Sequence, residues 1–245
     1  MIPKIIHYIW LGGKPLPKLV KKCIKSWRKF CPDYEIKRWD ESNLDLNECQ
    51  YARDAYDEKK WAFASDYFRF AILQKEGGIY LDTDVQLIKS LDTLLDQPCF
   101  MGFEKYEDTL HVNPGLILGA EKNNCFINDM LDIYKKDKFE MEDGKYETVC
   151  TKATNLLVEK YGLEIKDECQ NLKDVNIYSV EYFCPIDLIS KRPLYKTKNT
   201  ISKHLYMGSW CEKKFDFFKP IKWITRRILG EENFKRFKNW LRGKK

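Results

Sequence analysis

The stretch from Ala64 to Val85, ASDYFRFAILQKEGGIYLDTDV, constrains the fold more than any other part of the sequence. It predicts a helix, a Gly-Gly stop, a short apolar strand, and two aspartates, Asp82 and Asp84, at the end of that strand. Side chains two residues apart in a strand point to the same side. The pair therefore indicates an oxygen-rich site for a divalent cation or a phosphate. The alternative is a solvated turn, which such a short motif often forms.

The residues before this stretch predict a β–α–β opening. Lys4–Trp10 is apolar and β-branched, which is typical of a buried strand. Pro17–Phe30 has apolar residues at helical spacing, and Tyr34–Trp39 alternates as a second strand. This order favours an α/β fold with a parallel sheet and crossover helices. Later strands are predicted at Cys99–Glu104, Gly115–Gly119 and Val175–Pro185, and later helices at Asn124–Lys136 and Thr148–Tyr161.

The helix predicted over Lys60–Glu76 is apolar around much of its circumference, so we expect it to be largely buried. Asp66 and Arg69 lie three residues apart, on one face of this helix. At a surface, such a pair is an ordinary intrahelical ion pair of small energetic value. In a helix this apolar, the two charges more often line a polar cleft, because buried charges need partners.

Four further segments carry candidate residues. Trp10 ends the first strand and is predicted in the core, with a stacking platform for a base as the alternative. The glycines of Leu11–Pro15 form a turn that lets a ligand approach the backbone. Asn113 precedes a proline, so its amide has a defined direction, or it is an ordinary turn residue. The stretch from His204 to Trp210 predicts a surface loop or a lid over a cleft.

Composition excludes several classes of protein. The chain has 245 residues, of which 44% are hydrophobic, enough for one sizeable core. No apolar run is long enough for a transmembrane helix, and we expect no signal peptide at the N-terminus. The nine cysteines contain no C-x-x-C pair, so we expect reduced thiols rather than disulfides or zinc. With three histidines, a histidine-based metal site is not expected either.

The net charge of +6 comes from one end of the chain. Residues 219–245 hold ten Lys or Arg and two Glu, a net charge of +8, whereas residues 1–218 hold 33 basic and 35 acidic residues, a net charge of −2. A near-neutral domain over residues 1–218 argues against nucleic-acid binding. The tail repeats its apolar residues at helical spacing between basic ones, which predicts a helical anchor on an anionic membrane surface. The alternative is a helical hairpin docked on the domain.

Together these residues resemble glycosyltransferase family 32, whose members carry a DXD sugar-binding region. The resemblance rests on the opening Ile2–Trp10, the block from Ala64 to Asp84, and the late residues His204 and Gly208-Ser209-Trp210. The family includes capsule, surface-polysaccharide and yeast-type mannosyltransferases, and its core is related to that of the clostridial glucosylating toxins.

The resemblance implies a GT-A fold, with a Rossmann-like, mostly parallel sheet flanked by helices, and a nucleotide-sugar donor with Mn²⁺ or Mg²⁺. Asp84 is the expected metal ligand, and Asp82 would contact the ribose and the metal. Asp66 and Arg69 would hold the sugar hydroxyls and the diphosphate. The other implied site residues are Trp10 on the base, Tyr80 near the ribose or the sugar, Asn113 near the anomeric centre, Ser209 and Trp210 over the diphosphate, and His204 in the late block.

The sequence therefore predicts a metal-dependent, retaining hexosyltransferase. UDP-galactose or UDP-glucose is the favoured donor, and a surface polysaccharide or lipid-linked oligosaccharide is the favoured acceptor. We expect a cytoplasmic enzyme that is peripheral on the inner face of the plasma membrane through residues 219–245. Two alternatives remain open: a toxin-like transferase that modifies proteins, and a non-catalytic, membrane-docked binding module.

Overall fold

A computed structural model describes residues 1–106, 109–141, 146–186 and 197–207. The predicted tail, 219–245, and the predicted site residues Ser209 and Trp210 lie outside them. The strands are Ile5–Ile9 (β1), Glu35–Trp39 (β2), Gly78–Tyr80 (β3), Val85–Leu87 (β4), Cys99–Tyr106 (β5), Thr109–Val112 (β6), Leu118–Ala120 (β7), Gln170–Leu172 (β8), Val175–Tyr178 (β9) and Ser202–His204 (β10). The helices are Lys18–Phe30 (α1), Gln50–Asp57 (α2), Trp61–Glu76 (α3), Cys125–Lys136 (α4), Val149–Tyr161 (α5) and Val180–Phe183 (α6), with a 3₁₀ turn at Asp92–Leu94 (η1).

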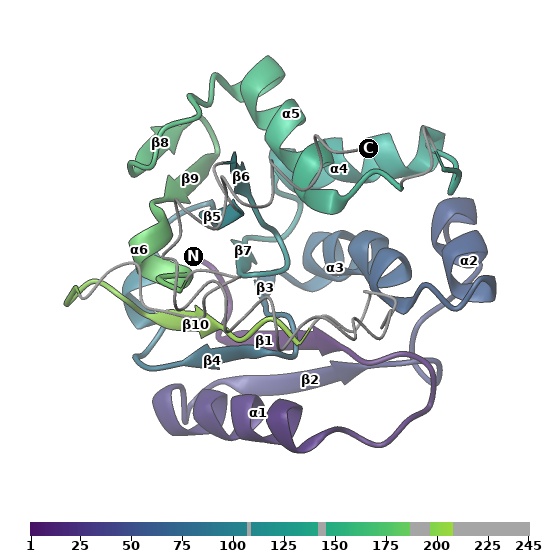
Figure 1. The fold of residues 1–245 in the computed structure, drawn as a ribbon, viewed down its shortest axis with the longest axis horizontal. Coiled ribbons are helices and arrows are strands. Elements are labelled where there is room, and N and C mark those ends of the chain that lie inside the picture. The colour runs from purple at the N-terminus through teal and green to yellow at the C-terminus, as the bar shows by residue number, and fades with distance from the viewer. Residues whose placement is uncertain (107–108, 142–145, 187–196, 208–245) are drawn as a thin grey trace, which may run out of the picture. The chain divides into compact units, whose positions relative to one another are not determined.

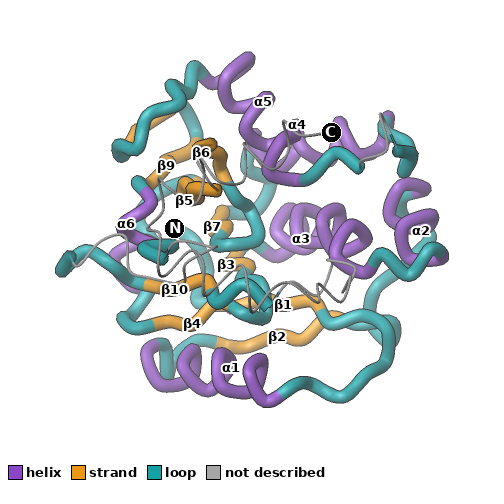
Figure 2. The backbone as a smooth tube through the Cα atoms, viewed as in Figure 1, coloured by secondary structure: helices purple, strands orange, loops and turns teal. Residues whose placement is uncertain are grey.

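The main sheet has eight strands in the order β2-β1-β3-β7-β5-β9-β8, with β6 beside β5. β1 is parallel to β2 and β3, and β5 is parallel to β9. β7 is antiparallel to both β3 and β5, so β1, β2, β3, β5 and β9 all run in one direction. The predicted mostly parallel α/β sheet is confirmed, with β7 as a reversed strand at its centre. Figures 1 and 2 show helices on both sides of these strands.

Two apolar cores lie on opposite faces of the sheet. α1 packs one core, through Val20, Cys23, Ile24 and Trp27, the residues at the predicted helical spacing. α2, α3, α4 and α5 pack the other core. In Figure 1, α1 accordingly lies on the far side of β1 and β2 from α3. The α3 helix is buried at every position from Ala64 to Leu73, which explains why charged side chains within that span need partners.

The side chain of His7 links β1 to the neighbouring strand β2 and to Gly77, the residue before β3. It is fully buried on β1, and its Nδ1 accepts a hydrogen bond from Trp39 Nε1 at 3.1 Å. Nε2 therefore carries the proton and donates to the Gly77 carbonyl at 2.9 Å. A side chain at Gly78, where φ is +105°, would place its Cβ 2.8 Å from His7 Nε2. The second glycine of the predicted helix stop is thus required by this close contact.

Acidification is expected to destabilise the fold through His7. Burial lowers the pKa of His7 from 6.5 to about 4. Between these values the unfolded chain binds a proton at His7 and the folded chain does not, so the free energy of unfolding falls as the pH is lowered, by at most about 3 kcal/mol. In urea unfolding between pH 6.5 and 4, His7→Gln should show a shallower decline than the wild type. Equal slopes would contradict this expectation.

Four short strands, β4, β6, β8 and β10, were not predicted. β4 follows Asp84 directly and pairs antiparallel with β10 through His204 and Val85, Lys203 and Gln86, and Ser202 and Leu87. Of the stretch from His204 to Trp210, predicted as a surface loop or a lid, only His204 lies in β10. Residues 205–207 follow without regular secondary structure, and residues 208–210 lie outside the described residues. The three residues of β10 offer no periodicity to detect.

No helix among the described residues has the length and apolarity to cross a lipid bilayer. The eight cysteines within the described part of the chain are all free.

Candidate functional site

The two aspartates of the DXD motif occupy the turn between β3 and β4, next to the middle of α3. The Asp82 side chain is 31% exposed and that of Asp84 is 11% exposed. Asp82 N–H donates to the carbonyl of Gly115 at 2.9 Å. Gly115 follows β6, so residues from three separated parts of the chain meet at this turn.

Asp66 and Arg69 lie beside Asp82 and form its charged surroundings. Arg69 Nη2 is 2.6 Å from Asp66 Oδ1 and 3.7 Å from Asp82 Oδ1. The guanidinium also covers the Tyr80 ring, 4.8 Å from its centroid. The Tyr80 hydroxyl donates to Asp82 Oδ1 at 3.0 Å. Asp66 and Arg69 are thus a buried pair rather than a solvated surface pair. That they line a polar cleft stays a prediction.

Gly115 was not among the predicted site residues, yet a larger residue there would disturb the site. A Cβ at position 115 would lie 2.3 Å from Asp82 Oδ2 and 2.9 Å from Arg69 Nη1. Any side chain would displace the Asp82 carboxylate or the guanidinium beside it. The glycine therefore sets how closely the β6–β7 turn approaches the aspartates.

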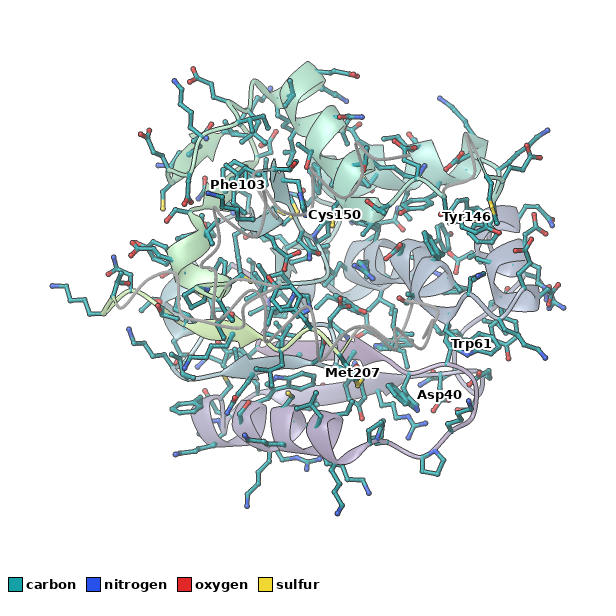
Figure 3. All side chains as sticks on the ribbon, in the orientation of Figure 1. Asp40, Trp61, Phe103, Tyr146, Cys150 and Met207 are labelled. Atoms are coloured by element: carbon teal, nitrogen blue, oxygen red, sulfur yellow. The ribbon has the colours of Figure 1, made fainter. Side chains whose placement is uncertain are left out.

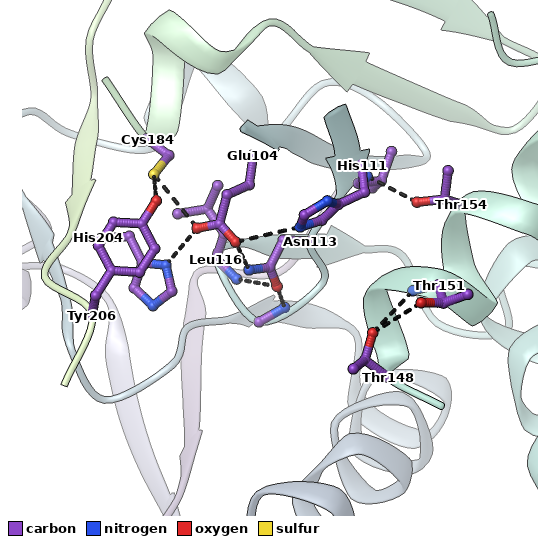
Figure 4. A network of polar contacts seen from close by, with 12 residues as sticks. Glu104, His111, Asn113, Leu116, Thr148, Thr151, Thr154, Cys184, His204 and Tyr206 are labelled. Atoms are coloured by element: carbon purple, nitrogen blue, oxygen red, sulfur yellow. Dashed lines mark hydrogen bonds and ion pairs between the residues drawn. The ribbon is translucent and has the colours of Figure 1, made fainter. Parts of the chain in front are cut away.

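Asp84 holds the late segment of the chain. Its backbone carbonyl accepts a hydrogen bond from Leu205 N–H at 3.0 Å, and its Oδ2 accepts one from Met207 N–H at 2.6 Å. Its Oδ1 lies 3.3 Å from His204 Nε2. The other ring nitrogen of His204, Nδ1, lies 2.8 Å from Glu104 Oε1 (Figure 4). His204 is therefore placed between two carboxylates.

The balance of charge in the site is negative. The described side chains of the cluster comprise four carboxylates, from Asp66, Asp82, Asp84 and Glu104, against the guanidinium of Arg69 and His204, which is charged only when protonated. Burial raises the pKa of Asp66 and of Asp82 above their ordinary values. Burial alone would also raise the pKa of Asp84, but the neighbouring His204 holds it below its ordinary value. Such a cluster is suited to a cation, which would offset the repulsion between its carboxylates.

The donor set fits a divalent cation. One side-chain atom each from Asp82, Asp84 and His204 lie within 4.8 Å of one another. Two carboxylates and one imidazole are ligands that suit manganese, and carboxylates also suit magnesium. The predicted pair Asp82 and Asp84 is thus brought together, and the structure adds His204, which sequence reasoning had discounted as a metal ligand because histidines are few.

Other predicted residues lie nearby in different settings. Trp10 is half-buried at the end of β1, and its Nε1 donates to the Lys14 carbonyl at 2.6 Å. In the turn that follows, Gly12 packs under Trp61, and Figure 3 shows Trp61 and Asp40 on the same side of the molecule. The role of Trp10 in stacking on a base stays a prediction.

Asn113 is engaged within the protein. Its Oδ1 accepts hydrogen bonds from Gly115 N–H at 2.8 Å and Leu116 N–H at 3.2 Å, and its Nδ2 donates to Glu104 Oε2 at 2.7 Å. It is therefore a turn asparagine whose side chain also reaches the His204 network. Its placement near an anomeric centre stays a prediction.

The segment that carries the aspartates matches a known family. Residues 17–101 match the family model for a glycosyltransferase sugar-binding region containing a DXD motif. The chain carries the sugar-binding region of a DXD-type glycosyltransferase. The resemblance predicted from the sequence is confirmed over this segment, which includes Asp66, Arg69, Asp82 and Asp84.

Individual relatives of this glycosyltransferase are distant. An uncharacterized glycosyltransferase of Acanthamoeba polyphaga mimivirus is 25% identical over 219 residues, which cover 86% of this chain and 84% of the relative. Inositol phosphoceramide mannosyltransferase 3 of Schizosaccharomyces pombe is 38% identical over 104 residues, which cover 41% of this chain and 29% of the relative. The solved structure of the PaToxG glycosyltransferase covers 65% of this chain and 70% of its own, with 24% identity and a TM-score of 0.49.

Proposed function

We propose that this glycosyltransferase moves a hexose from a nucleotide sugar to a glycan or lipid-linked acceptor, with a divalent cation, manganese or magnesium, held by Asp82 and Asp84. The observation that carries the proposal is the grouping of Asp82, Asp84 and His204 beside the buried Asp66–Arg69 pair. A non-catalytic module that binds phosphate would need cationic side chains such as Arg69. It would not need the excess of carboxylates found in this cluster.

We propose the following roles for the residues of the site. Asp84 and Asp82 hold the cation, which when bound supplies Lewis-acid stabilisation to the departing diphosphate. Arg69 fixes Asp66 at 2.6 Å and so orients that carboxylate for the hydroxyls of the sugar. Tyr80 is bonded to Asp82 and would border the ribose, while Trp10 would stack on the base. Ser209 and Trp210 would cover the diphosphate.

The proposed stereochemical outcome is retention. The sequence offers no residue that stands out as a covalent nucleophile, so we propose front-face displacement with the leaving phosphate oxygen as the base. UDP-galactose and UDP-glucose are the preferred donors. The name of the S. pombe relative specifies a mannosyltransferase acting on inositol phosphoceramide. That name supports a lipid-linked acceptor and makes GDP-mannose a donor to include in any test.

A donor-hydrolysis screen tests this function, because slow hydrolysis of a nucleotide sugar needs no acceptor. The full chain is incubated with Mn²⁺ and each of several UDP- and GDP-sugars, and release of the nucleoside diphosphate is measured. Release from one donor class, lost in EDTA and restored by Mn²⁺, is expected. Absence of release from every donor would favour the non-catalytic reading. Offering lipid-linked sugars against proteins then separates a polysaccharide enzyme from a toxin-like one.

We propose a location on the inner face of the plasma membrane, supported by the +8 charge of residues 219–245. Truncation after residue 218 should release the protein from vesicles that contain anionic lipid, because the basic residues that attract the headgroups are removed. Co-sedimentation of the full chain and the truncated chain with anionic and neutral vesicles measures this. Unchanged binding of the truncated chain would contradict the membrane role of the tail.

A further inference from the structure

Glu104, on β5, is a buried carboxylate outside the DXD motif. We propose that Glu104 is a positioning residue of the transfer site: it holds His204 against Asp84 and, through Asn113, holds the turn that supports Asp82. This inference rests on the cation site of the proposed function. Nothing in the sequence pattern singled out Glu104, which reads as the last residue of a predicted strand.

Both oxygens of Glu104 are engaged, although the residue is only 7% exposed. Oε1 faces His204 Nδ1 at 2.8 Å and Cys184 Sγ at 3.5 Å, and Oε2 faces Asn113 Nδ2 at 2.7 Å and His111 Nε2 at 3.8 Å (Figure 4). Among the contacts of the described residues, no lysine or arginine reaches this carboxylate. A buried carboxylate held by a histidine, an amide and a thiol is costly as a packing device alone.

The first arm of the network sets the orientation of His204. The backbone of His204 is fixed by the pairing of β10 with β4, but this pairing leaves the imidazole free to rotate about its side-chain torsions. Glu104 Oε1 contacts Nδ1 of His204, so the other ring nitrogen, Nε2, faces Asp84 Oδ1 at 3.3 Å. A carboxylate behind a histidine fixes which ring nitrogen faces a cation and makes that nitrogen a better ligand.

The second arm reaches Asp82. Glu104 accepts from the Asn113 amide, and the amide oxygen of Asn113 holds the N–H groups of Gly115 and Leu116. The Gly115 carbonyl in turn accepts from Asp82 N–H at 2.9 Å. One carboxylate is thereby connected to both aspartates of the motif, through two different parts of the chain. This is why we assign it to the site rather than to the core.

The isosteric variant Glu104→Gln tests the assignment. A glutamine has one oxygen and one amide in place of two oxygens, so it cannot accept from both His204 and Asn113. We expect the metal-free protein to bind Mn²⁺ about tenfold or more weakly than the wild type, as seen from the electron paramagnetic resonance signal of free Mn²⁺. In donor hydrolysis at saturating Mn²⁺, kcat should fall while KM for the donor stays within about twofold.

Asp129→Asn is the matched control. Asp129 also accepts from two groups, Lys160 Nζ and Tyr161 Oη, both at 2.6 Å, but it joins α4 to α5 rather than touching the aspartates. This variant should bind Mn²⁺ as the wild type does. If Glu104→Gln does not fold, Glu104→Asp replaces it, because aspartate keeps the charge but is too short to reach both arms, and the same weakening is expected.

Three outcomes separate the possibilities. Weaker Mn²⁺ binding by the Glu104 variant, with an unchanged melting temperature and a normal Asp129 control, supports the assignment. Wild-type Mn²⁺ affinity in the folded Glu104 variant overturns it and leaves the proposed function intact. Absence of Mn²⁺ binding by the wild-type protein overturns the cation site itself, and the positioning role with it.

Discussion

Replacing Asp84 with alanine is expected to abolish donor hydrolysis and the response to Mn²⁺ while the fold survives. The variant removes one of the two carboxylates proposed to hold the cation, and leaves His204 with Glu104 as its remaining carboxylate partner. We expect the rate of nucleoside diphosphate release to fall by roughly a hundredfold to a thousandfold, the range found when one charge-stabilising group is removed from an active site. The measurement is diphosphate release with and without added Mn²⁺.

The fold should tolerate this change because the variant keeps the backbone bond from Leu205 to the carbonyl of residue 84, and loses the side-chain contacts to Met207 N–H and His204. Asp132→Ala is the control, since Asp132 is an exposed residue of α4 that pairs with Lys135. Full activity of Asp84→Ala, or of the wild type in excess EDTA, would sink the proposed cation site.

Replacing Arg69 with methionine is expected to give the largest loss of stability. The Arg69 side chain is 3% exposed and neutralises Asp66 at 2.6 Å and Asp82 at 3.7 Å. Methionine fills similar volume but leaves both carboxylates without their cation. Breaking a buried ion pair from one side costs about 3 to 5 kcal/mol of the free energy of unfolding, measured in urea.

The double variant Asp66→Asn with Arg69→Met distinguishes the loss of a charge partner from the loss of packing. Because asparagine removes the carboxylate closest to the missing guanidinium, part of the lost stability should return. If Arg69→Met alone costs less than about 1 kcal/mol, the pair is not the buried, mutually dependent unit that the distances indicate.

Local patterns predicted the long helices and most of the parallel strands. The strand predicted over Val175–Pro185 was wrong in its second half, because β9 ends at Tyr178 and Val180–Phe183 forms α6. α1 begins after Pro17 and buries the residues at the predicted spacing, and α3 runs over the predicted apolar stretch. These features depend on periodicity within one segment, which a single sequence contains. The Asp66–Arg69 pair and the spacing of Asp82 and Asp84 are local for the same reason, so they too could be predicted.

The contacts that sequence reasoning missed join residues across long separations. Glu104 and His204 are 100 residues apart, and Gly115 reaches Asp82 only because β7 runs between β3 and β5. No local pattern marks such a contact, and the short strands β4, β8 and β10 have too few residues to show alternation. The Asn-Pro-Gly sequence at 113–115 was the one available sign of a constrained turn.

Because β10 is paired with β4, the position of residues 205–207 and the interactions of the Asp84 side chain depend on each other. Leu205 and Met207 bind the same aspartate that is proposed to face the cation. Thermodynamic reciprocity then applies: by whatever factor seating of this segment changes affinity for the ion, the ion changes the seating by that same factor. Occupancy of the aspartates by a cation would thereby be coupled to the position of residues 205–207.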